Sequence, residues 1–143
     1  MKLPIEKHIF ELLKHYDCVI ITGFGGFILN PRSAYLNDIT HRIHPPSKEV
    51  SFNKNLCTND GLLANYLTTV EKISYDEACI EIMKFSRKAK LKLHNNKSIF
   101  FEHIGTLQSN NNGHIEFIAN GAFNFDQESY GLRSFQIAKL ANI

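Results

Sequence analysis

Six basic side chains fall within one short segment and could bind a polyanion: Arg32, His41, Arg42, His44, Lys48 and Lys54. The surrounding residues 31–54 mix scattered apolar and polar side chains with Pro45 and Pro46, a pattern typical of an extended, poorly buried ribbon. Arginine and lysine on such a ribbon can reach successive phosphates along a nucleic-acid groove. The same composition also suits an ordinary solvated arm, kept polar to prevent aggregation at its edges.

Other chemistries are poorly supported by the spacing of the reactive residues. His41 and His44 lie close, but a three-residue offset on a β-ribbon puts the two rings on opposite faces, and no third ligand accompanies them. The glycine-rich stretch Thr22–Gly26 lacks the Lys-Ser/Thr of a phosphate-binding loop and precedes a strand rather than a helix. No Ser/His/Asp or Cys/His grouping can be picked out. We therefore expect a non-enzyme without metal or cofactor.

The elements that must position the ribbon are organised around a glycine-rich turn at residues 23–26, which we call the glycine corner. Short apolar runs, Cys18–Ile21 and Phe27–Leu29, flank Gly23-Phe24-Gly25-Gly26, which predicts a tight turn between paired strands. A fainter copy returns at 98–108, where Gly105 holds the place of Gly25 and each glycine precedes an apolar residue by two positions. This internal repeat predicts that the chain contains two copies of one small structural unit.

Helices are expected before each hairpin. Pro4 can start a first amphipathic helix with Ile5, Ile9 and Leu12 on its apolar face. Thr58 or Asn59 is expected to cap a second helix, and Ser74 with Glu77 has the form of a capping box at the start of a third, long one. On that long helix Lys84, Arg87 and Lys88 form a basic face, which we interpret as solvent-facing surface. A third strand is expected at 114–119, and the apolar tail 120–143 is expected to lie over the core and to be partly helical.

Composition bounds the class of protein. The chain has 143 residues, 43% of them hydrophobic and 21% charged, as in folded soluble domains. A net charge of +2 argues only weakly for nucleic acid. Three widely spaced cysteines form neither zinc-like pairs nor a disulfide framework, which favours a reducing cytoplasm and core thiols. No signal peptide or membrane span is recognisable.

The order of these elements resembles the HU/IHF family of DNA-bending proteins. Gly23-Phe24-Gly25-Gly26-Phe27 is similar to that family's Gly-Phe-Gly-Thr-Phe corner, and Pro45-Pro46-Ser47-Lys48 is similar to the segment where its arm returns to the body. The long helix 74–93 and the corner Ile104-Gly105-Thr106-Leu107 are similar to a second copy. More narrowly, residues 45–56 and 59–66 resemble the tandem HU modules of bacterial envelope proteins that carry a SPOR domain after a membrane span.

The resemblance implies an α+β fold of two HU-like units, each with helices and a small antiparallel β-sheet. We expect the first unit at 1–57 with an arm at about 31–54, and the second at 58–143 without an arm. Because HU proteins are intertwined dimers, two units in one chain are expected to form an intrachain pseudo-dimer with a shared core. The resemblance also implies a cytoplasmic location, tethered to the membrane only through segments beyond this chain.

The arm departs from the family's arm at its tip. HU-type arms carry an intercalating proline there, whereas Leu36–Thr40 has no proline and includes Asp38. We therefore expect no apolar wedge, and phosphate binding is better supported than sharp bending. The leading hypothesis is a non-catalytic module for double-stranded DNA. The rival is a protein-interaction scaffold, or self-association, in which Tyr35, Leu36, Ile39 and Ile43 pair with a partner's strand edge.

Overall fold

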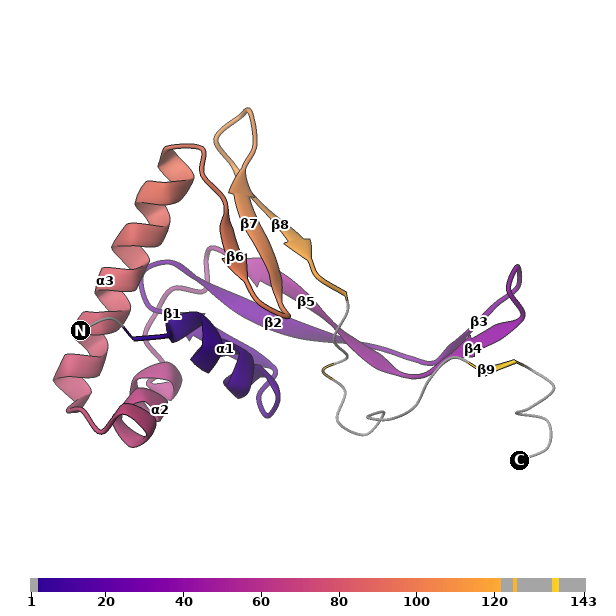
Figure 1. Cartoon of the computed structure of the whole chain (residues 1–143), viewed down its shortest axis with the longest axis horizontal. Helices are drawn as coiled ribbons and strands as arrows, with labels where there is room; N and C mark the ends of the chain where they lie inside the picture. Colours follow the sequence, from indigo (N-terminus) through magenta and orange to yellow (C-terminus); the bar gives the residue numbers. More distant parts are fainter. Residues whose placement is uncertain (1–2, 122–124, 126–134, 137–143) are drawn as a thin grey trace.

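The computed structural model describes residues 3–121, 125 and 135–136. The first half of the chain forms one helix and five strands: α1 (Ile5–Leu13), β1 (Cys18–Ile21), β2 (Gly25–Arg32), β3 (Tyr35–Asn37), β4 (Arg42–His44) and β5 (Ser47–Asn53). The described residues of the second half form α2 (Leu62–Glu71), α3 (Tyr75–His94), β6 (Ile99–Phe101), β7 (Gly105–Ser109), β8 (Ile115–Ala119) and β9 (Phe135–Gln136). The helices gather at one end of the molecule, and β3 and β4 lie at the other (Figure 1).

The two glycine corners build two similar antiparallel sheets, with strand orders β1-β2-β5 and β6-β7-β8. Each corner closes with the same turn, in which Phe24 N–H donates to Ile21 O at 2.9 Å and Ile104 N–H donates to Phe101 O at 3.0 Å. The third residue of each turn has a positive φ, +79° at Gly23 and 67° at His103. The predicted repetition of the hairpin is confirmed.

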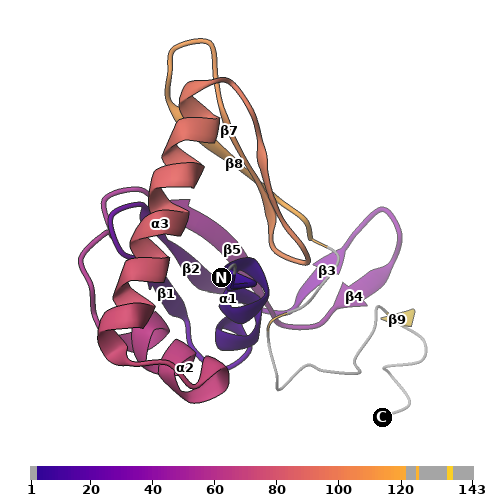
Figure 2. The ribbon, with the colours of Figure 1, turned by 60° about the vertical axis from the view of Figure 1, so that its left-hand side comes forward.

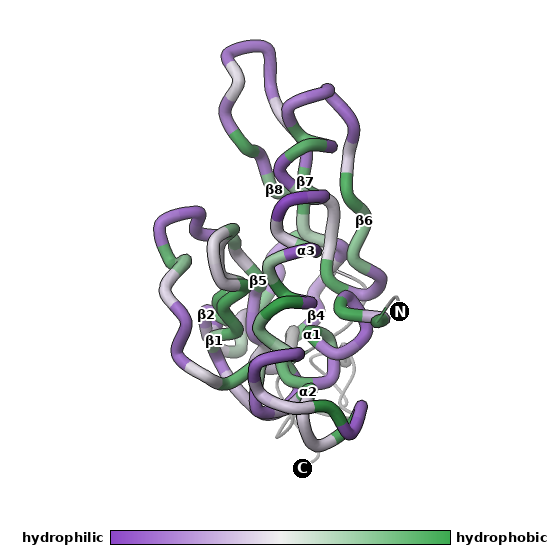
Figure 3. Tube along the Cα trace, turned by 90° about the vertical axis from the view of Figure 1, so that its left-hand side faces the viewer, coloured by the Kyte–Doolittle hydropathy of each residue, from purple (hydrophilic) through white to green (hydrophobic). Residues whose placement is uncertain are grey.

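One hydrophobic core joins the two units. The ring of Phe27 on β2 lies 5.0 Å from the ring of Phe101 on β6 and 5.7 Å from that of Phe117 on β8. On the helical side, the His8 Nε2 of α1 lies 3.2 Å from the Glu71 Oε2 of α2. Figure 3 shows a hydrophobic trace along β1 and β2 and a hydrophilic one at the turn between β7 and β8. The expected shared core is therefore confirmed.

The start of α3 agrees with the sequence prediction, and the start of α2 differs from it. Ser74 caps α3: its Oγ accepts from Glu77 N–H at 3.1 Å, as the capping box predicts. The cap expected for α2 at Thr58 or Asn59 is wrong, because α2 begins only at Leu62 and its N-cap is Gly61 with φ +85°. Asn59 Oδ1 accepts from Gly61 N–H at 2.9 Å, and so orders the loop before the helix rather than the helix itself.

The tail expected over the core lies mostly outside the described residues. Phe125 is buried, with its ring 5.7 Å from that of Phe10 on α1. Phe135 and Gln136 pair as β9 with Ile43 and Arg42 of β4. At those two residues, therefore, the chain is extended along the arm and is not helical.

Candidate nucleic-acid interface

The arm is a continuation of the first sheet. β2 and β5 stay paired over seven positions, from Gly26↔Asn53 to Arg32↔Ser47, whereas β1 covers β2 only as far as Ile28. Pro31 lies beyond β1, so its missing N–H removes no bond to that strand. The ribbon therefore leaves the body as two strands and projects away from the helices (Figures 1 and 2).

Beyond Arg32 the ribbon is interrupted and then re-forms as β3 and β4. Pro45 and Pro46 separate β4 from β5, and Tyr35↔His44 is the first pair beyond the break. At the tip, Asn37 Oδ1 accepts from Ile39 N–H at 2.9 Å and from Thr40 N–H at 3.1 Å. These two bonds fix the turn that the sequence predicted at Asn37-Asp38.

Two of the predicted contact residues are ion-paired at the root of the arm. Arg32 Nη1 lies 2.9 Å from Glu49 Oε1, and its guanidinium carbon lies 4.2 Å from the centre of the Tyr35 ring. Lys48 Nζ lies 2.9 Å from Asp17 Oδ1. Because alternate residues of a strand point to opposite faces, and Arg32 pairs with Ser47 while Pro31 pairs with Lys48, the two cations lie on opposite faces of the ribbon.

The other predicted residues are spread along the arm. His41 and Arg42 are exposed at the tip, and Lys54 is exposed where β5 ends on the body. His44 stands on β4 opposite Tyr35. Within the described residues, no ion pair involves Arg42 or Lys54. Arg42 and Lys54 are twelve positions apart, a distance of up to about 40 Å in extended chain. The cations are therefore spread along the arm and do not form one cluster.

The second unit has a turn where the first has an arm. Asn110 Oδ1 accepts from Asn112 N–H at 2.9 Å and from His114 N–H at 3.0 Å, and these bonds close the connection between β7 and β8. Among the described residues, β7 and β8 are therefore connected by a short turn, whereas β2 and β5 are connected through β3 and β4.

Comparison with protein families matches both halves of the chain. Residues 3–60 match the CCDC81-like prokaryotic HU domain 1, and residues 61–130 match the CCDC81-like prokaryotic HU domain 2. The chain is a tandem of two HU-like domains. Searches of curated proteins and of solved structures found no match. The association with a SPOR domain and the division at residue 57 remain predictions.

An exposed apolar side chain stands at the tip of the arm of the HU-like tandem. Ile39 is 90% exposed, held out by the turn at Asn37. Isoleucine is among the side chains that minor-groove proteins insert between base steps. Ile39 follows Asp38 in the sequence, but its exposure depends on the turn at Asn37 and is not part of the sequence pattern.

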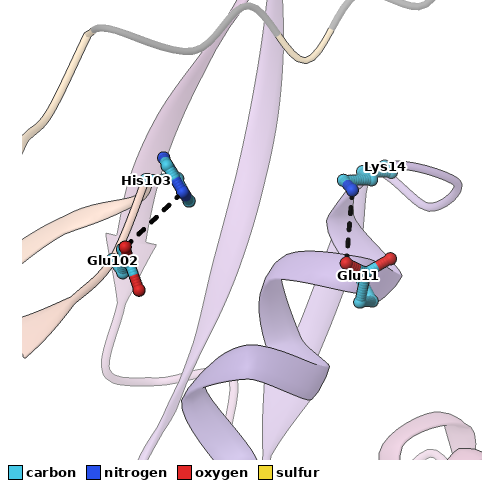
Figure 4. Close-up of polar contacts among 4 residues, drawn as sticks. All are labelled: Glu11, Lys14, Glu102 and His103. Carbon is cyan, nitrogen blue, oxygen red and sulfur yellow. Dashed lines mark hydrogen bonds and ion pairs between the residues drawn. The ribbon is translucent and has the colours of Figure 1, made fainter.

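The described part of the HU-like tandem has a hollow beside α1 that is lined by charged side chains. A hollow of about 460 Å³ between α1 and the β6–β7 turn is lined in part by Glu6, Lys7, Glu102 and His103. Figure 4 shows two ion pairs in this region, between Lys14 at the end of α1 and Glu11, and between His103 and Glu102 in the turn. Among the described residues, no group of three His, Cys, Asp or Glu side chains could hold a metal ion.

The three thiols of the HU-like tandem are free, and each lies in a different environment. Burial, with the Asp60 carboxylate as a smaller cause, raises the pKa of the half-buried Cys18 thiol. Cys57 is exposed on the loop before α2, and Cys79 is half-buried on α3. A raised pKa keeps Cys18 protonated and poorly nucleophilic at neutral pH.

No helix in the described part of the chain has the length and apolar character to cross a membrane.

Proposed function

We propose that this HU-like tandem binds double-stranded DNA without chemical change, through phosphate contacts along its single arm. The observation that carries the proposal is the geometry of the arm: a ribbon held away from the body, with exposed Arg42 near its tip and further cations toward its root. Such a ribbon can follow a groove and reach phosphates on both sides of it.

The ion pairs at the root are compatible with this role. The side chains of Arg32 and Glu49 are 51% and 59% exposed, and those of Lys48 and Asp17 are 30% and 67% exposed. Pairs this exposed contribute only about 0–1 kcal/mol to stability. A DNA phosphate can therefore replace either carboxylate as the partner of the cation at little cost.

The contacts can be tested by substitution along the arm. We expect Arg42→Ala and Lys48→Ala each to weaken binding to a labelled duplex and to reduce the slope of log K against log salt by about 0.9, one phosphate contact each. Lys7→Ala removes an exposed cation from α1 and is the matched control, expected to leave the slope unchanged. Equal slopes for all three variants and the parent protein would exclude the arm as the binding surface.

The exposed tip supports a test of bending. If Ile39 inserts at a base step, Ile39→Ala is expected to straighten the bound duplex, measured as a longer distance between dyes on its two ends. Affinity is expected to change less, because the phosphate contacts remain. An unchanged end-to-end distance would show that the tip does not act as a wedge.

A second candidate function is favoured by the apolar surface of the arm. Leu36 is 48% exposed and Tyr35 is 37% exposed, so the arm could bind a protein or a second copy of this chain. Among the described strands of the arm the order is β3-β4-β9, which places β3 at an edge of that sheet. Sedimentation of the parent protein and of Leu36→Ser tests self-association. If the arm binds a second copy of this chain, the parent protein is expected to be a dimer and the variant a monomer.

A cytoplasmic location is part of the proposal and is supported by the three free thiols. Linkage to the cell envelope rests on the resemblance to SPOR-associated modules and remains a prediction.

A further inference from the structure

The densest positive charge lies on α3 and the residue stretch after it, not on the arm. Six of the sixteen Lys and Arg residues fall between residues 84 and 97: Lys84, Arg87, Lys88, Lys90, Lys92 and Lys97. No Asp or Glu occurs between Glu81 and Glu102. The rest of the chain therefore has ten basic and fourteen acidic residues and is net negative, so the mild overall charge of +2 hides a strongly uneven distribution.

All six side chains are exposed. Five of them lie on α3 away from its buried face, and Lys97 lies in the stretch that follows the helix. Ala78, Ile82, Ala89 and Leu93 form that buried face. Lys84 lies 3.5 Å from Glu81, and within the described residues no ion pair involves the other five cations. We refer to these six exposed cations as the α3 cationic face.

Helix stability does not account for the α3 cationic face. Cations favour the C-terminal end of a helix, but the effect is confined to the last turn, where only Lys92 and His94 lie. Lys84 and Lys88, and Lys88 and Lys92, are like-charged neighbours four residues apart and destabilise the helix. Because this repulsion destabilises α3 along its length, an anionic ligand is a better explanation for the α3 cationic face than helix stability.

The character of the face favours duplex DNA over a membrane. A helix that lies in a lipid surface needs a continuous exposed apolar face. The buried face of α3 holds Ile82 and Leu93, and the large apolar side chains that α3 exposes, Tyr75, Ile80 and Leu91, are separated from one another along the helix. From Lys84 to His94 the helix rises about 15 Å. Duplex DNA presents one charge per roughly 1.7 Å of axis, so this length faces several phosphates at once.

We propose that the α3 cationic face is a second binding surface for duplex DNA, so that one molecule holds two duplex segments. The inference rests on the proposed function of the arm for the second segment. α3 and the arm lie at opposite ends of the long axis of the molecule, and both views place the body between them (Figures 1 and 2). A single straight duplex on the arm would therefore leave the α3 cationic face unoccupied.

The test is capture of one duplex by another through the full chain. Protein is bound to an immobilised duplex at low salt, and retention of a second, fluorescent duplex is measured. The variant Arg87→Gln/Lys88→Gln/Lys92→Gln removes three charges with little change in helix propensity, and Arg87→Lys/Lys88→Arg/Lys92→Arg keeps them. Circular dichroism and the melting temperature check that both fold.

We expect the glutamine variant to lose at least tenfold in captured duplex, and the charge-preserving variant to match the parent protein. The salt slope of the glutamine variant is expected to be smaller by up to about 2.7, for three phosphate contacts. Unchanged capture and slope would overturn the inference. Binding of the face to anionic vesicles or to an acidic protein, with DNA binding unaffected by the glutamine variant, would overturn it equally.

The arm variant Arg42→Ala/Lys54→Ala separates this inference from the proposed function. If the arm variant keeps full affinity while the glutamine variant loses it, the arm proposal fails and the α3 cationic face stands. If only the arm variant loses affinity, the reverse holds. A parent protein that binds no duplex at low salt contradicts both.

Discussion

At the scale of single residues, an aromatic ring over a glycine is repeated in the two sheets. A Cβ on Gly25 would overlap the Phe52 ring, and a Cβ on Gly105 would overlap the Phe117 ring. Phe52 lies opposite Phe27 in the register, and Phe117 lies opposite the equivalent Leu107. The sequence predicted the equivalence of the two glycines, but the rings that require them come from strands about 27 and 12 residues away in the chain, a distance that no local pattern spans.

We expect Gly25→Ala to destabilise the protein by about 1–3 kcal/mol, because the Phe52 ring must move out of a packed core. The free energy of unfolding in urea measures the effect. Gly113→Asn is the control: nothing lies within 4 Å of a Cβ there, and asparagine tolerates the positive φ of +79°. A loss at Gly25 no larger than that at Gly113 would show that the ring does not rest on the glycine.

The thiols give a second prediction at this scale. Cys57 is exposed, whereas burial raises the pKa of Cys18, so a thiol reagent at neutral pH is expected to modify Cys57 first. As the pH rises toward the raised pKa of Cys18, its thiolate fraction and its reaction rate increase. Mass spectrometry of the folded protein at increasing pH measures both rates. Faster modification of Cys18 at neutral pH would contradict its placement in the first sheet.

The sequence indicates which cations lie on the arm, but not which residues they pair with, and their role in binding stays a prediction. These cations could be found because they fall on one extended segment. Their pairing could not, since Lys48 meets Asp17, which is 31 positions away in the chain, and Arg32 meets Glu49 across the ribbon. The α3 cationic face was visible only in part, as Lys84, Arg87 and Lys88, because its meaning depends on which helix face the core buries.

At the scale of elements, the two helix starts offer a matched pair of substitutions. Ser74 caps α3 with its side chain, so Ser74→Ala is expected to cost about 1 kcal/mol of stability. Thr58 precedes the start of α2 at Leu62 and makes no cap, so Thr58→Ala is expected to change stability by less than about 0.5 kcal/mol. Equal losses from chemical denaturation would contradict the observed starts.

The difference between these helix starts also shows what local pattern can predict. The capping box is a contact over three residues and is legible in the sequence. The start of α2 depends on a left-handed Gly61 and on Asn59 and Asp60, whose side chains accept from the backbone two residues on. Several residues in that loop could have served as the cap, and backbone conformation decides among them.

At the scale of the whole molecule, the two units are expected to unfold together. Phe27 contacts its own sheet through Phe52 and the second unit through Phe101 and Phe117. We expect Phe27→Ala to cost about 3–5 kcal/mol and to reduce hydrogen-exchange protection in both units alike. Two separate unfolding transitions, or protection lost from the first unit alone, would contradict the shared core. The repeat in the sequence predicted two units, and the family resemblance implied that they share a core. The ring contacts that join the units were not predictable, because Phe27 and Phe101 are far apart in the chain.

The most direct test of the central claim is the affinity of the full chain for a labelled duplex, measured by fluorescence anisotropy across about 50 to 200 mM salt. A tandem that holds DNA by its phosphates predicts a linear fall of log K with log salt, with a slope of about −0.9 for each phosphate contacted. Absence of binding at the lowest salt, or affinity independent of salt, would contradict the claim.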